Sequence, residues 1–370
     1  MSTDRILRVE VIPAALPVRP HEDESRGDAQ QHVFLRLETQ SGVVGWGEAR
    51  ALPSWTGETL ESITTTLSDY FAPVLLHASP FARNAILATC DEIVTGAVSN
   101  GMPAAKAAVD IALHDLQGKL AGVAIHELLG GKVHDQLPLA HSLRAESPAA
   151  MREGALRFHD SGCLKVKLTG DATLDGERLA AVSDAAPQAS IWLDGNQNYS
   201  PTSAMSMLER IRGIKRVVCL QQPLPSTDWF GMARLRQRSP LPIAVDEGCF
   251  SPHDVLRVAQ LQVADLVVLK LCKAGGLRDL VRQAEIAQAA GLDLLGSGLT
   301  ESGIGLAAAV HVFSTLKLRL PPQLNGPQYL SHLLVKGLEF NGKGAVKVPN
   351  GPGLGVEVDE ELLRSFAISD

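Results

Sequence analysis

The sequence lacks the features of secreted, membrane-spanning and nucleic-acid-binding proteins. It has five cysteines in 370 residues, an odd number without CxxC spacing, which argues against a disulfide framework. It contains no apolar run of about 18 residues that could cross a bilayer, and no apolar segment with a basic start opens the chain. The formal net charge is −7, without a cluster rich in lysine or arginine. These absences predict a cytoplasmic protein that binds neither nucleic acid nor a membrane.

Length and composition indicate two folded units. A chain of 370 residues, of which 45% are hydrophobic, can bury more than one ordinary core. Three strand-like segments come first and three helical patterns follow, at residues 7–18, 32–39, 43–49, 58–71, 80–95 and 102–120. We therefore expect an α+β domain over residues 1–130.

From residue 164 onward one sequence pattern recurs at a nearly fixed interval. A short apolar run ends in a charged or polar side chain, and an amphipathic stretch follows. The runs end 24 to 27 residues apart, at Lys167, Asp194, Gln221, Asp246, Lys270 and Ser297. That interval accommodates one strand, one helix and two short loops, so it predicts consecutive βα units.

These units predict a parallel barrel over residues 131–326. Its first strand is expected at residues 137–143 and its eighth at 318–325. Helical patterns fill the intervals, at residues 148–159, 174–185, 202–212, 252–260, 277–290 and 303–316. The remaining segment, residues 327–370, is too short to fold alone, and we expect it to return to the first domain.

Three oxygen-bearing side chains end successive strands of this barrel. In a closed parallel barrel every strand presents its C-terminal end to the same mouth, so Asp194, Gln221 and Asp246 should converge. Mg²⁺ is bound by such a small set of oxygens together with waters and substrate, and Mn²⁺ is the alternative. Any one of these residues could instead cap the following helix. Three at matching positions favour a metal site.

Lysines flank the predicted metal site. Lys165 and Lys167 lie two apart in a strand, so their side chains leave the same face. Their mutual repulsion should lower the pKa of at least one, which makes it a usable base near neutral pH. Lys270 reaches the mouth from the opposite side. This arrangement predicts an enzyme that moves a proton at the carbon next to a carboxylate, on either face.

Two segments of the first domain could cover the mouth. Residues 21–31 are polar, and residues 51–57 place Pro, Ser and Gly around Trp55. Segments of this kind are candidates for lids, although an ordinary solvated loop explains residues 21–31 equally well.

Six motifs carry a resemblance to a known family. In chain order they are LKVKLTGD, WLDGNQNY, LQQPLP, PIAVDEG, VVLKLCKAGGL and GSGLTESGIGLAAAVH. They resemble the enolase superfamily and, within it, the muconate lactonizing enzyme subgroup. The segment AAKAAVDIALHDLQGKLAG extends the resemblance into the first domain. The resemblance implies a modified TIM barrel, (β/α)7β, beneath an α+β capping domain whose two lid segments set substrate specificity.

The resemblance also implies roles for individual residues. Lys167 and Lys270 would be the acid/base pair, and Lys165 would assist electrostatically. Asn196 and Glu247 would lie around the metal ligands, and Glu301 would lie near the seventh strand end. Ser297 ends that strand in the repeating pattern, and we expect it with Glu301 on the substrate side.

Gln221 departs from the family pattern, which has glutamate at that position. An amide oxygen can coordinate Mg²⁺ but brings no charge, so the ligand charge falls from −3 to −2 and the affinity for the metal should fall. Either the enzyme uses Gln221 as a neutral ligand, or the protein is a catalytically silent binding protein that keeps the pocket.

Fold alone does not choose the reaction, because this superfamily hosts several. The segment LRLPPQLNGP lacks the Asp-x-Asp that dipeptide epimerases carry at the eighth strand. Trp55 and Thr56 resemble the capping loop of cycloisomerases that act on muconates. We therefore expect an isomerase, a homo-oligomer that lactonizes a small muconate-type carboxylate. The alternatives are a racemase or epimerase of an N-modified amino acid and a carboxylate dehydratase.

Overall fold

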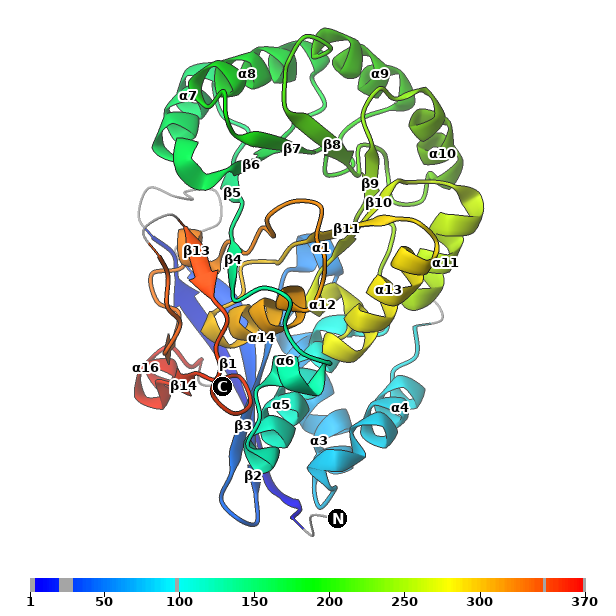
Figure 1. The fold of residues 1–370 in the computed structure, drawn as a ribbon. Coiled ribbons are helices and arrows are strands. Elements are labelled where there is room, and N and C mark those ends of the chain that lie inside the picture. Colours follow the sequence, from blue (N-terminus) through cyan, green and yellow to red (C-terminus); the bar gives the residue numbers. More distant parts are fainter. Residues whose placement is uncertain (1–3, 20–28, 97–99, 342–343, 369–370) are drawn as a thin grey trace.

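The computed structural model describes residues 4–19, 29–96, 100–341 and 344–368. Figure 1 shows a curled parallel sheet ringed by helices, with an antiparallel sheet and its helices beneath it. In this described part of the chain, no helix has the length and apolar character needed to cross a membrane.

The capping domain is built on an antiparallel sheet in the order β1-β2-β3. Its strands span Ile6–Pro17, Ala29–Thr39 and Val44–Arg50, as the apolar segments predict. Helix α5 (Pro103–Ala121) lies directly against β3. A Cβ at Gly47 would collide with the carbonyl of Ala108 in α5. Glycine is therefore needed for this close approach.

The helix predicted over residues 58–71 is not one regular helix. It begins as α2 (Leu60–Thr65), continues as the π-helix η2 (Thr66–Phe71) and ends in α3 (Ala72–Leu75). Thr59 and Ser62 form a capping box that fixes the start of α2 two residues later than the apolar pattern indicates. Helix α4 (Arg83–Ile93) follows after the short turn η3 (Pro80–Ala82).

The second domain is a seven-stranded parallel sheet in the order β11-β10-β9-β8-β7-β6-β5. From β5 to β11 the strands span His141–Leu143, Cys163–Lys167, Ser190–Asp194, Val217–Gln221, Ile243–Val245, Leu266–Leu269 and Asp293–Gly296. The repeating βα pattern of the sequence is confirmed.

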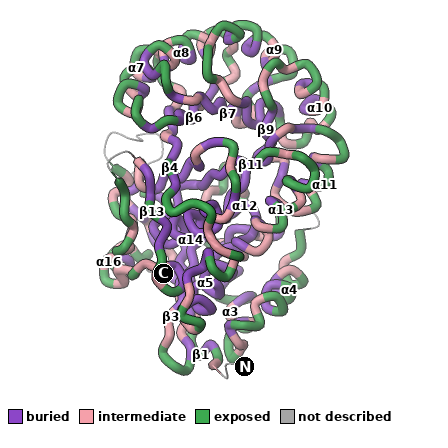
Figure 2. The backbone as a smooth tube through the Cα atoms, in the orientation of Figure 1, coloured by how far each residue is buried: buried purple, intermediate pink, exposed green. Residues whose placement is uncertain are grey.

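Helices form the outer ring of the barrel. They are α7 (Pro148–Arg157), α8 (Ala172–Ala185), α9 (Pro201–Arg210), α10 (Trp229–Arg238), α11 (Pro252–Leu261), α13 (Leu277–Ala289) and α14 (Gly303–Ser314). Figure 2 shows buried strands inside this ring and exposed outer faces on the helices from α7 to α13, whereas α14 is buried throughout. The sequence pattern missed α10, whose second half carries three arginines and a glutamine around Leu235.

Barrel closure differs from the prediction at both ends. The segment predicted as the first strand divides into β4 (Gln136–Pro138), which pairs with β13 (Ala345–Lys347), and β5. The predicted eighth strand is reduced to one bridge between Gln323 and Ser297. The Ala140 N–H donates to the Pro322 carbonyl at 3.0 Å, so this segment still joins β5 to β11. Consecutive prolines at 321 and 322 supply no N–H donors, which explains the short pairing.

The C-terminal segment contacts both domains. Besides β13, it contains β12 (Val335–Lys336) paired with β14 (Glu357–Val358), and α16 (Glu360–Ser365). Ala367 bridges to Ala14 in β1. Short helical turns complete the fold, namely α1 (Pro53–Thr56), α6 (Ile125–Leu128), η4 (His159–Ser161), α12 (Leu271–Ala274) and α15 (Gly326–Tyr329).

Buried carboxylates of the capping domain fix it to the barrel. Glu48 accepts hydrogen bonds from the backbone N–H groups of Ser302 at 2.6 Å and Gly305 at 2.7 Å, at the start of α14. Asp110 in α5 accepts one from the Arg278 N–H at 2.9 Å, at the start of α13. A negative charge is favourable at a helix N-terminus. These bonds hold the capping domain in one orientation against the barrel.

Candidate active site

Three of the predicted site residues lie in one row across neighbouring strands. Lys167 in β6 is in register with Asp194 in β7, which is in register with Gln221 in β8. The next strands, β9 and β10, end one residue before Asp246 and Lys270. All five side chains therefore stand at the same end of the barrel.

Asp194 holds the two lysines of β6. Its fully buried carboxylate lies 3.1 Å from Lys165 Nζ and 2.7 Å from Lys167 Nζ. Lys167 also donates to Asn196 Oδ1 at 2.6 Å, and Asn196 Nδ2 donates to Glu247 Oε1 at 2.9 Å. Asn196 has a φ of 39°, which is unusual for a residue with a side chain. Such strain is typical of functional sites.

Asp246 forms a second cluster on the other side. Lys270 Nζ and Gln221 Nε2 each donate to Asp246 Oδ2 at 2.6 Å. Lys273 donates to Asp246 Oδ1 at 2.9 Å, to the Asp246 carbonyl at 3.0 Å and to the Val268 carbonyl at 2.6 Å. The three ammonium hydrogens of Lys273 are thus all used. The sequence reasoning missed Lys273, although it lies one helical turn beyond Lys270.

The pKa values of Lys165 and Lys270 are shifted in opposite directions. Burial lowers the pKa of Lys165 to about 8, and repulsion from Lys167 is a smaller cause than the sequence reasoning assumed. Burial acts in the same sense on Lys270, but the Asp246 carboxylate beside it raises the pKa above its usual value. Lys270 is therefore held protonated, whereas Lys165 loses its proton more readily than an ordinary lysine but stays mostly protonated at pH 7.

The oxygen atoms at the strand ends fit a hard cation. Gln221 Oε1 and Glu247 Oε2 are buried and have no hydrogen-bond donor. Burial, then the charge of Asp246, raises the pKa of Glu247 to about 7. The described residues contain no group of three or more His, Cys, Asp or Glu side chains that could hold a metal. A cation here would need the free amide oxygen of Gln221 beside Asp194 and Asp246, which is an oxygen set that suits Mg²⁺.

The two segments that the sequence predicts as lids differ in what the structure describes of them. Residues 21–28 lie outside the described residues, and residues 29–31 begin β2. Residues 51–57 contain the helical turn α1 rather than an open loop. Its half-buried Trp55 contacts the Phe250 ring, with 5.6 Å between centroids. The Thr56 hydroxyl donates to the Leu52 carbonyl at 3.3 Å, so this side chain stabilises the turn.

A cavity of about 110 Å³ lies over the strand ends. Five of the predicted residues line it, namely Trp55, Lys165, Lys167, Asn196 and Lys270. The other lining residues are Leu52, Ser142, Arg144, Gly298, Leu299, Thr300, Gln323, Asn325 and Tyr329. Three of these could have been found from the sequence, because Arg144 follows the first barrel strand and Gln323 and Asn325 fall in the expected eighth strand.

Two predicted residues support this cavity from behind. The Ser297 hydroxyl donates to Gln323 Oε1 at 2.9 Å, and Lys165 Nζ donates to the same oxygen at 3.3 Å. The Glu301 carboxylate accepts the Leu299 N–H at 2.9 Å. Ser297 and Glu301 therefore hold Gln323 and Leu299, which line the cavity, in position.

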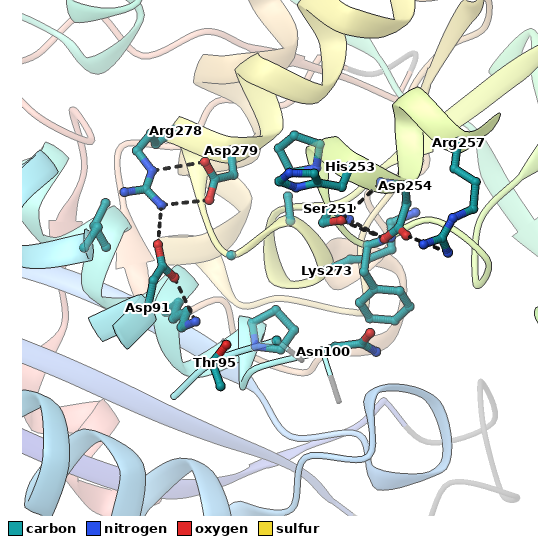
Figure 3. Close-up of a pocket in the computed structure, with 18 residues that line it drawn as sticks. Asp91, Thr95, Asn100, Ser251, His253, Asp254, Arg257, Lys273, Arg278 and Asp279 are labelled. Carbon is teal, nitrogen blue, oxygen red and sulfur yellow. Dashed lines mark hydrogen bonds and ion pairs between the residues drawn. The ribbon is translucent and has the colours of Figure 1, made fainter. Parts of the chain in front are cut away.

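A larger cavity of about 710 Å³ lies between α4, α5 and the barrel helices α11 and α13. Figure 3 shows that acidic and basic side chains in this cavity pair with one another, as in Asp91 with Arg278 and Asp254 with Arg257. Asp91 lies 2.8 Å from Lys106 and 3.1 Å from Arg278, which also bonds Asp279. The smaller cavity is the better candidate site, because it contains the lysines of the strand ends.

Family comparisons agree with this geometry. Residues 150–362 match the family described as enolase C-terminal domain-like. The chain belongs to the enolase superfamily. Residues 7–130 match the N-terminal domain of the mandelate racemase and muconate lactonizing enzyme family. This superfamily member is therefore muconate lactonizing enzyme-like in both domains.

Several relatives of this enolase superfamily member are isomerases. A chloromuconate cycloisomerase of Cupriavidus necator is 32% identical, over 91% of each chain. An N-succinyl-L-Arg/Lys racemase of Bacillus cereus is 29% identical, over 91% of this chain and 90% of the relative. The muconate lactonizing enzyme from Pseudomonas putida superposes with a TM-score of 0.90 at 30% identity, over 98% of this chain and 100% of that one.

The structure of the Bacillus cereus racemase gives a TM-score of 0.92 at 28% identity, over 99% of this chain and 98% of that one. The modified TIM barrel with an N-terminal capping domain is confirmed, and the chain is an isomerase of the enolase superfamily. Enzymes of this group generally depend on a divalent metal, and they act on small molecules.

Proposed function

We propose that the protein moves a proton at the carbon next to a substrate carboxylate, with Lys167 and Lys270 as the acid/base pair. One observation carries this proposal. The two lysines line one cavity from β6 and from the end of β10, and each is bonded to a different buried aspartate. A planar carbon between them would be open to one lysine on each face.

The residues around these lysines would hold and orient the substrate. Asp194, Gln221 and Asp246 would bind Mg²⁺, and Mn²⁺ is the alternative. When bound, this ion would neutralise the charge that develops on the carboxylate as the proton leaves. Lys165 adds a positive charge beside Asp194, which favours the same enediolate. Lys270, held protonated by Asp246, is suited to return a proton.

Muconate-type cycloisomerization is the first candidate reaction. It is supported by the likeness to chloromuconate and muconate cycloisomerases and by Trp55, whose apolar ring lines the cavity. Racemization of an N-succinyl amino acid is the second candidate. It is supported by the Bacillus cereus racemase and by the presence of a lysine on each side of the cavity.

Deuterium exchange from solvent tests the proton transfer before the natural substrate is known. The protein with MgCl₂ would be incubated in D₂O with muconolactone and with each enantiomer of N-succinyl-lysine, and exchange would be followed by NMR. We expect exchange in at least one probe, and Lys167→Ala should slow it by about two orders of magnitude or more. Lys317→Ala is the matched control, because Lys317 is exposed.

The products separate the candidate reactions. Ring opening of muconolactone to muconate in these spectra identifies a cycloisomerase, and inversion of N-succinyl-lysine, read by chiral chromatography, identifies a racemase. Loss of water from a hydroxy acid added as a third probe identifies a dehydratase. Mg²⁺ binding without exchange in any carboxylate of a broad panel would contradict the proposal and favour a silent binding protein.

Two expectations about the protein as a whole belong to this proposal. All five cysteines are buried free thiols, which suits a reducing cytoplasm. Homo-oligomer formation is tested by light scattering during gel filtration, where a monomeric mass would contradict it.

A further inference from the structure

An aromatic ring of the capping domain lies on one of the two barrel lysines. Lys270 Nζ is 3.9 Å from the centroid of the Trp55 ring. The same Nζ donates to Asp246 Oδ2 at 2.6 Å. The ammonium group is therefore held between an aromatic face from one domain and a carboxylate from the other.

The physics of this contact favours a fixed position for Lys270. The face of an indole ring carries negative charge and attracts a cation within about 6 Å, more strongly where water is excluded. Lys270 is only 3% exposed. A lysine side chain has a flexible four-carbon stem, so the contact restricts a group that would otherwise have several orientations.

Trp55 is itself fixed from both domains. Its ring lies 5.6 Å from that of Phe250, which follows the barrel strand β9. On the capping side, α1 ends at Thr56, and the N–H of the next residue, Gly57, donates to the Pro53 carbonyl at 3.1 Å. The next residue, Glu58, is buried and accepts the N–H of Ala104 at 3.1 Å, at the start of α5. The indole ring of Trp55 is therefore held in place by contacts with both domains.

We propose that Trp55 is a positioning residue for Lys270, so that placing α1 over the cavity also directs the Lys270 ammonium toward the reacting carbon. The inference rests on the proposed function, in which Lys270 transfers a proton at one face. It adds that α1 determines the position of Lys270 only. The position of Lys167, which is bonded to Asp194 and Asn196, does not depend on α1.

Exchange at the two faces tests this asymmetry. The variants are Trp55→Leu, which removes the aromatic face, and Trp55→Phe, which keeps one. The matched control is Trp229→Leu, because Trp229 is also half-buried beneath a cation, with Arg257 at 5.1 Å, but does not line the cavity. Each N-succinyl-lysine enantiomer would first be assigned to its lysine with the variants Lys167→Ala and Lys270→Ala.

We expect Trp55→Leu to slow exchange of the Lys270-dependent enantiomer about tenfold or more relative to the other, with little change in KM. Trp55→Phe should recover most of this loss, and Trp229→Leu should show none. Equal slowing of both enantiomers would overturn the inference, because the ring would then only shape the pocket.

A second measurement keeps the inference separable from the proposed function. Reductive methylation of lysines in the substrate-free protein, read by peptide mass spectrometry, should label Lys270 faster in Trp55→Leu than in the parent or in Trp55→Phe. Absence of exchange in every carboxylate of the panel by the parent protein would refute the proposed function and not this contact. Unchanged labelling of Lys270 in Trp55→Leu would refute the contact itself.

Discussion

Replacing Gln221 with glutamate tests the metal site most directly. The Gln221 Nε2 donates to Asp246 Oδ2 at 2.6 Å, and both side chains are fully buried. The change Gln221→Glu replaces this donor with a carboxylate oxygen. Loss of a hydrogen bond to a charged group costs about 1.5–3 kcal/mol. Two unit charges about 4 Å apart repel by about 4 kcal/mol at an effective dielectric constant of about 20.

Nearby cations offset part of this cost. Lys270 lies 2.6 Å from Asp246 and would screen the new charge. We therefore expect the metal-free variant to lose about 2–4 kcal/mol of unfolding free energy at pH 8. Added Mg²⁺ should reverse the effect, because a third negative ligand raises hard-cation affinity. A gain of tenfold or more in the association constant corresponds to about 1.4 kcal/mol.

Thermal unfolding during a MgCl₂ titration, with calorimetry for the binding constant, checks both expectations. Gln283→Glu is a matched control. Gln283 is also buried, donates through Nε2 to the Phe250 carbonyl at 2.9 Å and has a free Oε1. Its variant should lose stability without recovery by Mg²⁺. Unchanged stability and Mg²⁺ affinity in Gln221→Glu would mean that Gln221 does not face a cation.

The sequence predicted the positions of the strand-end residues because their side chains obey a simple rule. A parallel strand buried on both faces is apolar until its C-terminal end, and the first polar side chain marks that end. Lys167, Asp194 and Gln221 were located in this way. The way in which the barrel closes was not predicted. Gln323 joins Ser297 through one backbone bridge and one side-chain hydrogen bond, and not through a regular strand.

The pairing of the charged groups also escaped prediction. Spacing shows that Lys165 and Lys167 share a strand face, but not that both point to Asp194 at 3.1 and 2.7 Å. The role of Lys273 depends on a helical turn that begins immediately after β10, which bends the chain back over Asp246. Such contacts depend on tertiary packing, and local periodicity does not contain them.

The remaining predictions concern stability. Lys273→Met should lower the unfolding free energy by about 3–5 kcal/mol with or without Mg²⁺, because it leaves the buried Asp246 without one of its cations. An unchanged midpoint of urea denaturation would contradict the structural role of Lys273. Burial raises the pKa of Glu58 from 4.5 to about 7. The folded state then binds more protons than the unfolded state between these values, so Glu58 alone should contribute a loss of about 3 kcal/mol of stability as pH rises from 4.5 through 7. Urea denaturation at pH 5 and pH 8 should show this loss in the parent and in the control Glu61→Gln, whose side chain is exposed. The loss should be smaller by about that amount in Glu58→Gln, because an amide does not titrate, whereas Glu247, whose pKa is also raised to about 7, titrates in all three proteins. An equal pH dependence in all three proteins would show that Glu58 is not buried as a neutral acid against the start of α5.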